Sequence, residues 1–277
     1  MCFDSTPFAF RFYNVSYKCS LILETELETE DQNQTTRHGQ GVLVLVSIFD
    51  LHVHTNRGSR DSSLDPEELV VEAQRIGLTG VMVTEHDGWP RHDFEDFARS
   101  YDIVLVRALE VYTPLGHIIT IGLDGHVTGF SGGIETVRKL RSDVERVGGL
   151  MILAHPFRFL FDPHGLHTRN LLFEDPSVLP LTAQEASKHP IFDLVDQIEV
   201  VNGGNIEKEN RLAQQVAEIL QLSGTGGSDA HSVNGLGKGT TFFKGEIRNS
   251  SDLVEAISAG DFVPVEGFHV GNPSYYD

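Results

Sequence analysis

Hydrophobic residues along the chain fall into short runs that suit buried strands, and the segments between them have the three-to-four-residue spacing of helices. Runs of this kind lie at 42–49, 80–84, 103–111, 117–123, 150–155, 196–202 and 240–243. Uninterrupted apolar runs of this length are typical of parallel strands covered on both faces. The pattern therefore predicts an α/β fold in which helices wrap a sheet of parallel strands.

Three intervening segments carry helix signals. In DPEELVVEAQRIG, Asp65 is a natural N-cap, Pro66 fits the first helical position, Glu68 completes a capping box and Gly77 ends the helix. Further helices are expected in GGIETVRKLRSDVERVGG and NIEKENRLAQQVAEILQ. The predicted buried stripes of the three are Leu69, Ala73 and Ile76; Ile134, Val137, Leu140, Val144 and Val147; and Leu212, Val216 and Ile219.

Two regions fall outside this alternation. Residues 1–41 include an acidic, polar stretch with little to bury, and we expect a poorly ordered extension or a short added hairpin there. Residues 42–277 are expected to form one domain. Within it, residues 157–190 contain several prolines and are longer than an ordinary connection, which predicts a lid or an inserted helical excursion.

Composition narrows the choice of partners. The formal charge of −19 disfavours a long nucleic-acid duplex as a partner. Cys2 and Cys19 lie far from the polar clusters described below, so a disulfide framework or a thiolate metal site is not expected. No apolar run is long enough to span a membrane, and the start of the chain lacks a signal-peptide pattern. We expect a cytoplasmic protein that does not bind membranes, of unspecified oligomeric state.

Polar residues with metal-ligating side chains follow successive predicted strands. His52 and His54 come at the end of the first run, two residues apart, so their side chains point to the same side. The others are His86, Glu110, His117, His155, Asp229 and His231, and Asp61 lies in the first strand-to-helix loop. In barrels of parallel strands, sites are assembled at the C-terminal ends of the strands. These nine side chains are therefore expected to meet.

A single histidine at a strand end is usually a hydrogen-bonded structural residue, but several in succession favour a metal cluster. Imidazole and carboxylate ligands without thiolates suit Mn, Fe or Zn. Nine ligands exceed the need of one ion, so two or three divalent ions are expected. The remaining histidines are interpreted as solvated or capping residues, His38, His92, His126, His189 and His269, or as part of the lid segment, His164 and His167.

The ordered motifs DLHVHT…SRDSSLDPEEL, TEHD, E…GH, AHPFR, IEVVNG and GSDAH resemble those of the PHP (polymerase and histidinol phosphatase) family of metal-dependent phosphoesterases. The resemblance runs from about residue 48 to about residue 240. It implies a distorted, TIM-like (β/α)7 barrel with a trinuclear metal centre at the C-terminal rim. The implied ligands are His52, His54 and Asp229 for the first ion, Glu110 as a bridge, His117 and His155 for the second, and Asp61, His86 and His231 for the third.

The implied reaction is hydrolysis of a small phosphate monoester or short nucleotide by a hydroxide that bridges metal ions. Arg158 is the first candidate to bind the phosphate, and Lys238 and Arg57 are further candidates, although each could equally be a surface counter-charge. Supporting roles in catalysis are expected for Glu199 and Asn202, which would orient ligands, and for Asp87, which would orient His86 or cap its turn. Asp50 is expected to orient an imidazole.

Several functions remain open from the sequence. Relatives that act on nucleoside bisphosphates or short RNAs carry a long insertion between the histidines matching His117 and His155, which are only 38 positions apart here; this spacing disfavours a nucleotide substrate. Histidinol-phosphatase-like or exonuclease-like activity, an amidohydrolase-type metallohydrolase and a non-catalytic metal-binding PHP domain are the alternatives. The amidohydrolase class usually adds a lysine ligand at a strand end, which the mid-chain strands do not offer.

Overall fold

The computed structural model describes residues 11–13, 20–24, 41–125, 132–161, 169–175, 179–271 and 273–275. The strands are β1 Arg11–Tyr13, β2 Ser20–Glu24, β3 Gly41–Val53, β4 Gly80–Glu85, β5 Val104–Thr113, β6 Gly116–Ile121, β7 Leu150–Leu153, β8 Gln197–Asn202, β9 Thr225–Gly227, β10 Gly239–Lys244, β11 Phe262–Glu266 and β12 Ser274–Tyr275. The α-helices are α1 Pro66–Ile76, α2 Arg91–Ala98, α3 Gly133–Arg146, α4 Ala183–Ala186, α5 Glu207–Leu220 and α6 Ser250–Ala259, with short 3-10 turns at Pro190–Leu194, Val233–Gly235 and Phe268–Val270.

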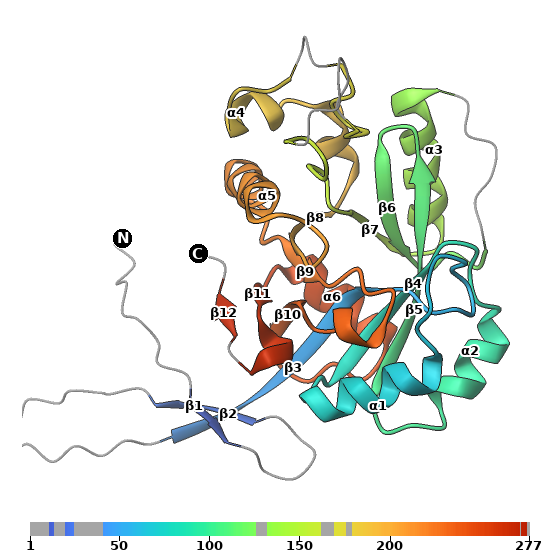
Figure 1. The fold of residues 1–277 in the computed structure, drawn as a ribbon, viewed down its shortest axis with the longest axis vertical. Coiled ribbons are helices and arrows are strands. Elements are labelled where there is room, and N and C mark those ends of the chain that lie inside the picture. The colour runs from blue at the N-terminus through green and yellow to red at the C-terminus, as the bar shows by residue number, and fades with distance from the viewer. Residues whose placement is uncertain are drawn as a thin grey trace, which may run out of the picture.

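The strands form a curled sheet in the order β12-β11-β10-β3-β4-β5-β6-β7-β8-β9, with helices packed around it (Figure 1). Neighbours pair in parallel from β3 to β5 and from β7 to β9. The predicted α/β class is thus confirmed, whereas the count of seven strand–helix units stays a prediction.

Two strands run against the predicted direction. β6 is antiparallel to both β5 and β7, because only Pro114 and Leu115 separate it from β5 and two residues cannot make the crossover that a parallel partner needs. β10 is antiparallel to β3. The expectation of an all-parallel sheet was therefore wrong at both places. The reversal of β6 matters for the site, since it brings the start of this strand to the edge where the parallel strands end.

The end of β9 reaches back to the end of β3. The backbone N–H of Asp229 donates to the carbonyl of His52 at 2.7 Å, and the N–H of His54 donates to the carbonyl of Ala230 at 3.0 Å. Val53 and Ala230 form a parallel bridge. The curled sheet is thereby closed on the side where His52 and Asp229 lie. This Gly-rich strand is too short and too poor in apolar residues to be recognised from hydrophobicity.

The predicted helix signals are largely present. Asp65 caps α1 by accepting from the N–H of Glu67 at 2.8 Å, Pro66 begins the helix, and Gly77 ends it at a φ of 88°. Leu69 and Ala73 are fully buried. In α3, Val137, Leu140 and Val144 are buried as expected, but Val147 lies beyond the helix and is half exposed. In α5, Val216 is buried whereas Ile219 is exposed, because Ala213 and Ala217 form the inward face instead.

The core has an inner and an outer part. Phe49, Met82, Val106 and Ile152 face the inside of the curled sheet and pack with Leu253 and Ile257 of α6. On the outside, α1 covers β3 and β4, while α3 and α5 cover β5 to β8. Because rigid, buried strands carry the site residues at their ends, the packing holds these residues in place.

The segments outside the predicted alternation are described only in part. Strand β2 pairs with the first residues of β3, and β1 pairs with β2 (Figure 1). Of the predicted lid at 157–190, Phe157, Leu160, Leu172 and Ala186 are buried against α3 and α5. The rest of residues 1–41 and residues 126–131, 162–168 and 176–178 lie outside the described residues, and with them the expectations for His38, His126, His164 and His167. Within the described part of the chain, no helix is both long and apolar enough to cross a membrane.

Candidate metal centre

The structure brings all nine predicted ligands together at one edge of the sheet. His52 and His54 lie at the end of β3 and His86 directly after β4. Glu110 lies near the end of β5, and His155 lies shortly after β7. Asp229 and His231 follow β9. His117 comes from the start of β6 and reaches the same edge because β6 is antiparallel to its neighbours.

Glu110 lies at the centre of the cluster. Its Oε1 atom is 2.9 Å from Nδ1 of His117, 3.0 Å from Nε2 of His155 and 3.4 Å from Nε2 of His52. Its Oε2 atom is 3.3 Å from Nε2 of His54 and 3.4 Å from Nδ1 of His86. The side chain is only 2% exposed. A single buried carboxylate thus connects five histidines from four different parts of the chain.

Asp229 faces the same two imidazoles from the other side. Its Oδ1 atom is 3.5 Å from Nε2 of His52 and 3.3 Å from Nε2 of His54. Both Asp229 and His155 have positive φ values, 55° and 29°, which are uncommon for residues with a side chain. Such backbone conformations persist only where the surrounding structure holds them.

A third group lies nearer the solvent. Oδ2 of Asp61 is 3.4 Å from Nε2 of His86 and 3.3 Å from Nε2 of His231. The ring of His54 is stacked between these two histidines, with centroid distances of 4.4 Å to each. Although its partial burial acts against ionisation, the pKa of Asp61 is lowered by His86 and His231.

The protonation of the metal-free cluster shows how much negative charge it holds. Burial opposes ionisation of Glu110 and Asp229, but the neighbouring histidines bring the pKa of each carboxyl well below its ordinary value. Burial also opposes charging of His52, yet Glu199, Asp229 and Glu110 raise its pKa well above the ordinary value. Likewise the pKa of His54 is raised to about 9 by hydrogen bonds to Asp229 and Glu110, which outweigh burial. Buried carboxylates here require positive charge beside them.

These residues fit divalent cations. Nε2 of His52 lies only 3.0 Å from Nε2 of His54, so two nitrogen lone pairs would face each other unless a proton or a cation separates them. Four groups of three ligand atoms lie within 4.8 Å of one another. They are His54, His86 and His231; His52, His54 and Glu110; His52, His155 and Asp229; and Glu110, His117 and His155. Nitrogen and carboxylate donors without sulfur are those of Zn, Mn and Fe sites.

Glu199 and Asn202 of β8 lie directly beside the cluster. Oε1 of Glu199 is 3.0 Å from Nδ1 of His52, and Oε2 accepts from the backbone N–H of His155 at 2.9 Å. Asn202 Nδ2 donates to Oε2 of Glu199 at 2.8 Å. The hydrogen bond to Glu199 places the proton of neutral His52 on Nδ1 and leaves Nε2 directed into the cluster.

Two supporting residues contact other groups than expected. Asp50 does not touch an imidazole; it accepts from the backbone N–H groups of Ser228 at 2.8 Å, Gly237 at 2.9 Å and His52 at 3.3 Å. It therefore positions backbone, and burial raises its pKa to about 6. The exposed carboxylate of Asp87 pairs with Arg60 at 3.2 Å rather than with His86.

The three predicted phosphate-binding cations lie in different surroundings. Arg158 is close to the cluster, but its guanidinium is engaged: Nη1 is 2.6 Å from Oδ2 of Asp229, Nη2 donates to Asn202 at 2.5 Å and Nε donates to Asn205 at 2.9 Å. Lys238 is exposed and makes no ion pair within the described residues. Arg57 lies 5.8 Å from the ring centroid of Trp89.

Sequence reasoning missed two residues that contact the site. Oγ of Ser59 is 3.2 Å from Nδ1 of His54, and it donates to the buried Glu85 at 2.6 Å. Glu85 is part of the TEHD motif, directly before His86. Its position at the end of an apolar run, where a buried acid is unusual, was the signal that could have identified it. Ser59 offered no comparable signal, since loop serines are common.

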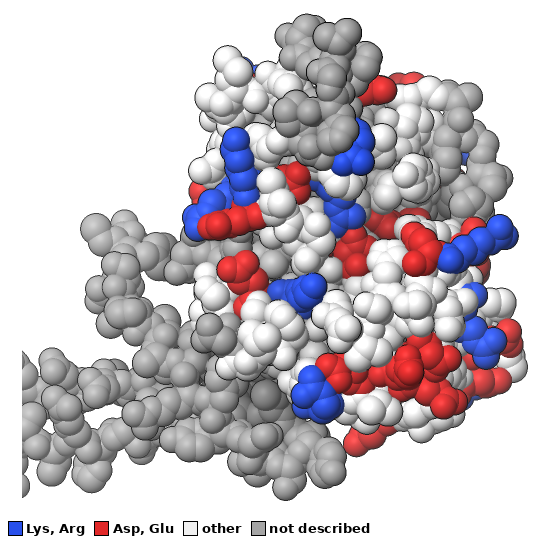
Figure 2. All heavy atoms as spheres, viewed as in Figure 1, with Lys and Arg blue, Asp and Glu red and all other residues white. Residues whose placement is uncertain are grey.

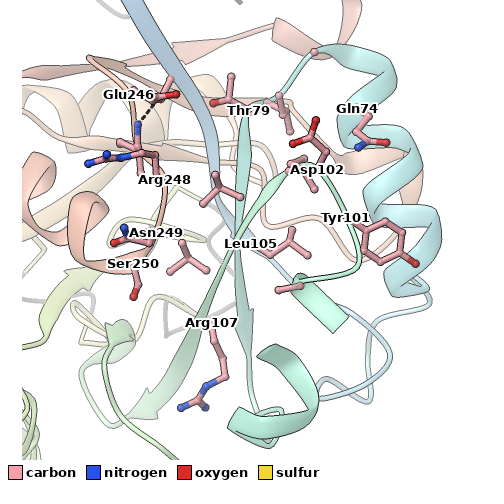
Figure 3. A pocket seen from close by; sticks show the side chains of 18 of the residues that line it. Gln74, Thr79, Tyr101, Asp102, Leu105, Arg107, Glu246, Arg248, Asn249 and Ser250 are labelled. Atoms are coloured by element: carbon pink, nitrogen blue, oxygen red, sulfur yellow. Dashed lines mark hydrogen bonds between the residues drawn. The ribbon is translucent and has the colours of Figure 1, made fainter. Parts of the chain in front are cut away.

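A large pocket lies away from this cluster. It has a volume of about 1480 Å³ and is lined by the end of α1, by α2, by the first half of β5 and by the segment Glu246–Ser250, as Figure 3 shows. None of the nine predicted ligands lines it. Arg107, which lines it, already donates to the carbonyl of Leu123 at 2.7 Å and pairs with Asp124. The concentration of ligating groups, and not the size of a cavity, marks the candidate site.

Several proteins of known structure have a fold similar to that of this chain. A family model described as PHP-associated matches residues 207–262, which include Asp229 and His231. A two-domain protein from Bacteroides vulgatus that contains a predicted PHP-like metal-dependent phosphoesterase has a TM-score of 0.56 at 19% identity, over 80% of this chain and 65% of that protein. The chain thus spans less than two thirds of that relative's length.

Two further solved structures are similar. A protein from Bifidobacterium adolescentis, proposed to be a metal-dependent phosphoesterase, has a TM-score of 0.52 at 16% identity, over 76% of this chain and 96% of its own. PsfC from Pseudomonas syringae has a TM-score of 0.50 at 17% identity, over 77% of this chain and 89% of its own. No curated protein matches the chain. At these identities the likeness concerns the fold.

Proposed function

We propose that the chain is a member of the PHP family and a metal-dependent phosphoesterase that hydrolyses a small phosphate monoester. The observation that carries the proposal is Glu110, a buried carboxylate in contact with five histidines. Such a set is costly to bury without cations, and it has the composition of sites that hold more than one divalent ion.

Three groups of residues would hold the ions. His52, His54 and Asp229 would bind the first, His117 and His155 the second with Glu110 between them, and Asp61, His86 and His231 the third. Bound divalent ions supply positive charge to phosphate oxygens and make a water molecule more acidic. Zn, Mn and Fe are all compatible with the donors, so two to three ions of one of these metals are proposed as cofactors.

The side chains around the cluster have separate tasks in this proposal. Glu199 would keep Nε2 of His52 available to the first ion, and Asn202 would hold Glu199 in position through the hydrogen bond that it donates. Arg158, paired with Asp229, would fix this ligand and present its remaining surface to the phosphate. Lys238, which is exposed and makes no ion pair within the residues described, is the cation that a substrate can engage without displacing an existing pair.

A small substrate suits the surface better than a polymer. The chain carries a net charge of −19, and Figure 2 shows acidic side chains gathered over α1 on the face drawn. Such a surface repels a nucleic-acid backbone, whereas a small phosphate ester meets chiefly the local charge of the ions and of neighbouring bases. We therefore propose a small phosphorylated partner and no long duplex.

The amidohydrolase alternative is less well supported. That class usually adds a lysine ligand, and within the described residues no ion pair of the nine ligand side chains involves a lysine. Histidinol phosphate, sugar phosphates and short nucleotides all remain within the proposed substrate class.

The proposal is tested by metal analysis of the purified protein together with a phosphatase screen after loading with Mn. Substrates include p-nitrophenyl phosphate, histidinol phosphate and nucleoside mono- and bisphosphates. We expect phosphate release from at least one of them, and loss of both metal and activity in His54→Ala. His92→Ala, an exposed histidine paired with Asp96, is the matched control. A fully loaded protein without phosphatase activity, together with a His54→Ala variant that binds metal normally, would contradict the proposal.

A further inference from the structure

Glu85 is a buried carboxylate beside the cluster that the proposed reaction does not use. It is the last residue of β4 and is fully buried. Oε1 accepts from the hydroxyl of Thr55, and Oε2 accepts from the backbone N–H of Thr55 at 3.1 Å and from the hydroxyl of Ser59 at 2.6 Å. Within the part of the chain that the structure describes, each of these hydrogen bonds has Glu85 as the acceptor.

The hydroxyl of Ser59 has a single hydrogen, and the contacts determine where it points. The shortest contact, 2.6 Å, is to the carboxylate of Glu85. An ionised carboxylate has no hydrogen to donate, so in this contact Ser59 is the donor. The lone pairs of Oγ are then left to accept from the backbone N–H of His86 at 3.1 Å and from Nδ1 of His54 at 3.2 Å. For this arrangement to hold, Nδ1 of His54 must carry a hydrogen.

The consequence appears on the opposite nitrogen of the same ring. A neutral imidazole has one hydrogen, so a hydrogen on Nδ1 leaves the lone pair on Nε2. Nε2 of His54 is the atom that faces Nε2 of His52 at 3.0 Å, Oε2 of Glu110 at 3.3 Å and Oδ1 of Asp229 at 3.3 Å. Ser59 therefore decides whether His54 can offer a ligand atom to the centre of the cluster.

We propose that Glu85 is a positioning residue that acts through Ser59 to hold His54 in the form with Nε2 available to a metal ion. The inference rests on the proposed function, since it concerns a residue assigned there as a ligand. It assigns to the Glu of TEHD the role that Glu199 has toward His52, so that the two histidines of the first pair are each oriented by a separate buried carboxylate.

Glu85 also holds the loop after β3, so a purely structural role must be distinguished from the positioning role. A Cβ atom on Gly58 would lie 2.6 Å from Cβ of Glu85, so the loop packs directly on this side chain. Ser62 provides the matched control within the same loop. It is buried and donates to the backbone carbonyl of His54 at 2.8 Å, and its hydrogen bonds within the described residues are to backbone atoms and not to an imidazole ring.

Two substitutions of Glu85 separate the hydrogen bond from the charge. In Glu85→Gln, the amide oxygen can take the place of Oε2 and accept from Thr55 N–H and from Ser59, while its NH2 group donates to the Thr55 hydroxyl, which can rotate to accept. In Glu85→Met no acceptor remains, and the hydrogen of Ser59 is free to turn toward Nδ1 of His54. The positioning role thus predicts that Gln preserves the native form and Met does not.

The experiment measures zinc affinity by competition with a chromophoric chelator, with urea unfolding of each metal-free variant in parallel. We expect Ser59→Ala and Glu85→Met to weaken zinc binding by about 10- to 100-fold. Glu85→Gln and Ser62→Ala should stay close to the native affinity. Equal losses in Ser59→Ala and Ser62→Ala, or a loss in Glu85→Gln as large as in Glu85→Met, would overturn the inference.

The outcome also separates this inference from the proposed function. If the native protein binds neither zinc nor manganese, the metal centre itself is refuted. If the native protein binds zinc and Ser59→Ala binds it as tightly, only the positioning role is refuted. Should Glu85→Met fail to fold, the comparison of Ser59→Ala with Ser62→Ala still decides the question.

Discussion

Nε2 of His52 and Nε2 of His54 lie 3.0 Å apart at the end of one strand, and the other ring nitrogen of each is held by a different element of the chain. Glu199 of β8 contacts Nδ1 of His52, and Ser59 of the following loop contacts Nδ1 of His54. Both imidazoles are thus turned toward the same point between Glu110 and Asp229. Two nitrogens at this distance require a positive charge between or beside them, and the predictions below follow from the way that charge is supplied.

The stability of the metal-free protein should depend on pH through His54. Its pKa is raised from an ordinary 6.5 to about 9, because hydrogen bonds to Asp229 and Glu110 outweigh burial. A folded-state pKa above the unfolded value stabilises the fold fully below pH 6.5, and this contribution is lost as the pH rises through 9. The shift corresponds to roughly 3 kcal/mol. Urea unfolding of chelator-treated protein across this pH range measures it.

Metal should remove that dependence, because an ion takes the place of the proton on Nε2. The zinc-loaded protein is the control, and its unfolding free energy should not fall between pH 6.5 and pH 9 in the same way. A metal-free protein with constant stability over this range would contradict the prediction.

Glu110→Gln should abolish both metal binding and activity. The substitution removes the negative charge that lies between His117, His155 and the first histidine pair, and places an N–H group among imidazoles. Since metal ions contribute several kcal/mol to transition-state stabilisation, we expect phosphatase activity to fall by at least about 100-fold. Glu145→Gln, which changes an exposed carboxylate paired with Arg141, is the control. Retention of metal by Glu110→Gln would argue against a bridging position.

Gly227→Ala should damage the centre by steric means alone. A Cβ atom there would lie 2.4 Å from Cβ of His52 and 2.7 Å from Oε1 of Glu199, so β9 would have to move away from β3. Overpacking of this kind costs about 1–3 kcal/mol. Urea unfolding and zinc affinity should both be reduced. Gly125→Ala, where a Cβ would meet nothing within 4 Å, should leave both unchanged. Native zinc affinity in Gly227→Ala would show that the pair His52–Glu199 tolerates displacement.

Lys238→Gln should weaken substrate binding without loss of metal. A hydrogen bond from a charged group contributes about 1.5–3 kcal/mol, so KM should rise by about tenfold or more with kcat little changed. Lys244→Gln removes a lysine that is already paired with Asp261 and serves as the control. An unchanged KM would contradict this prediction and show that Lys238 is a surface counter-charge. Arg158→Gln, in contrast, should also lower metal content, because Arg158 pairs with the ligand Asp229.

Much of the candidate site was predictable because the ligating residues lie at the ends of apolar runs that are recognisable in the sequence. His52, His86 and Glu110 could be placed together from the rule that parallel strands end at one edge of a sheet. His117 reached the same edge for a different reason, since β6 is reversed, and the short Pro114–Leu115 connection that reverses it was visible in the sequence. The cap of α1 at Asp65 was equally local, since its partners lie within two residues.

The sequence by itself determined which chemistry the chain can carry and the order in which strands present it, because residue type, strand periodicity and helix caps are local properties. Only the tertiary structure decided which nitrogen of each histidine is offered, and what Asp50 and Glu85 do. Asp50 binds the backbone of Ser228 and Gly237, far along the chain. Glu85 reaches His54 through the hydroxyl of Ser59. The orientation of a hydroxyl or of a backbone N–H depends on neighbours brought together by folding, and no local pattern encodes it.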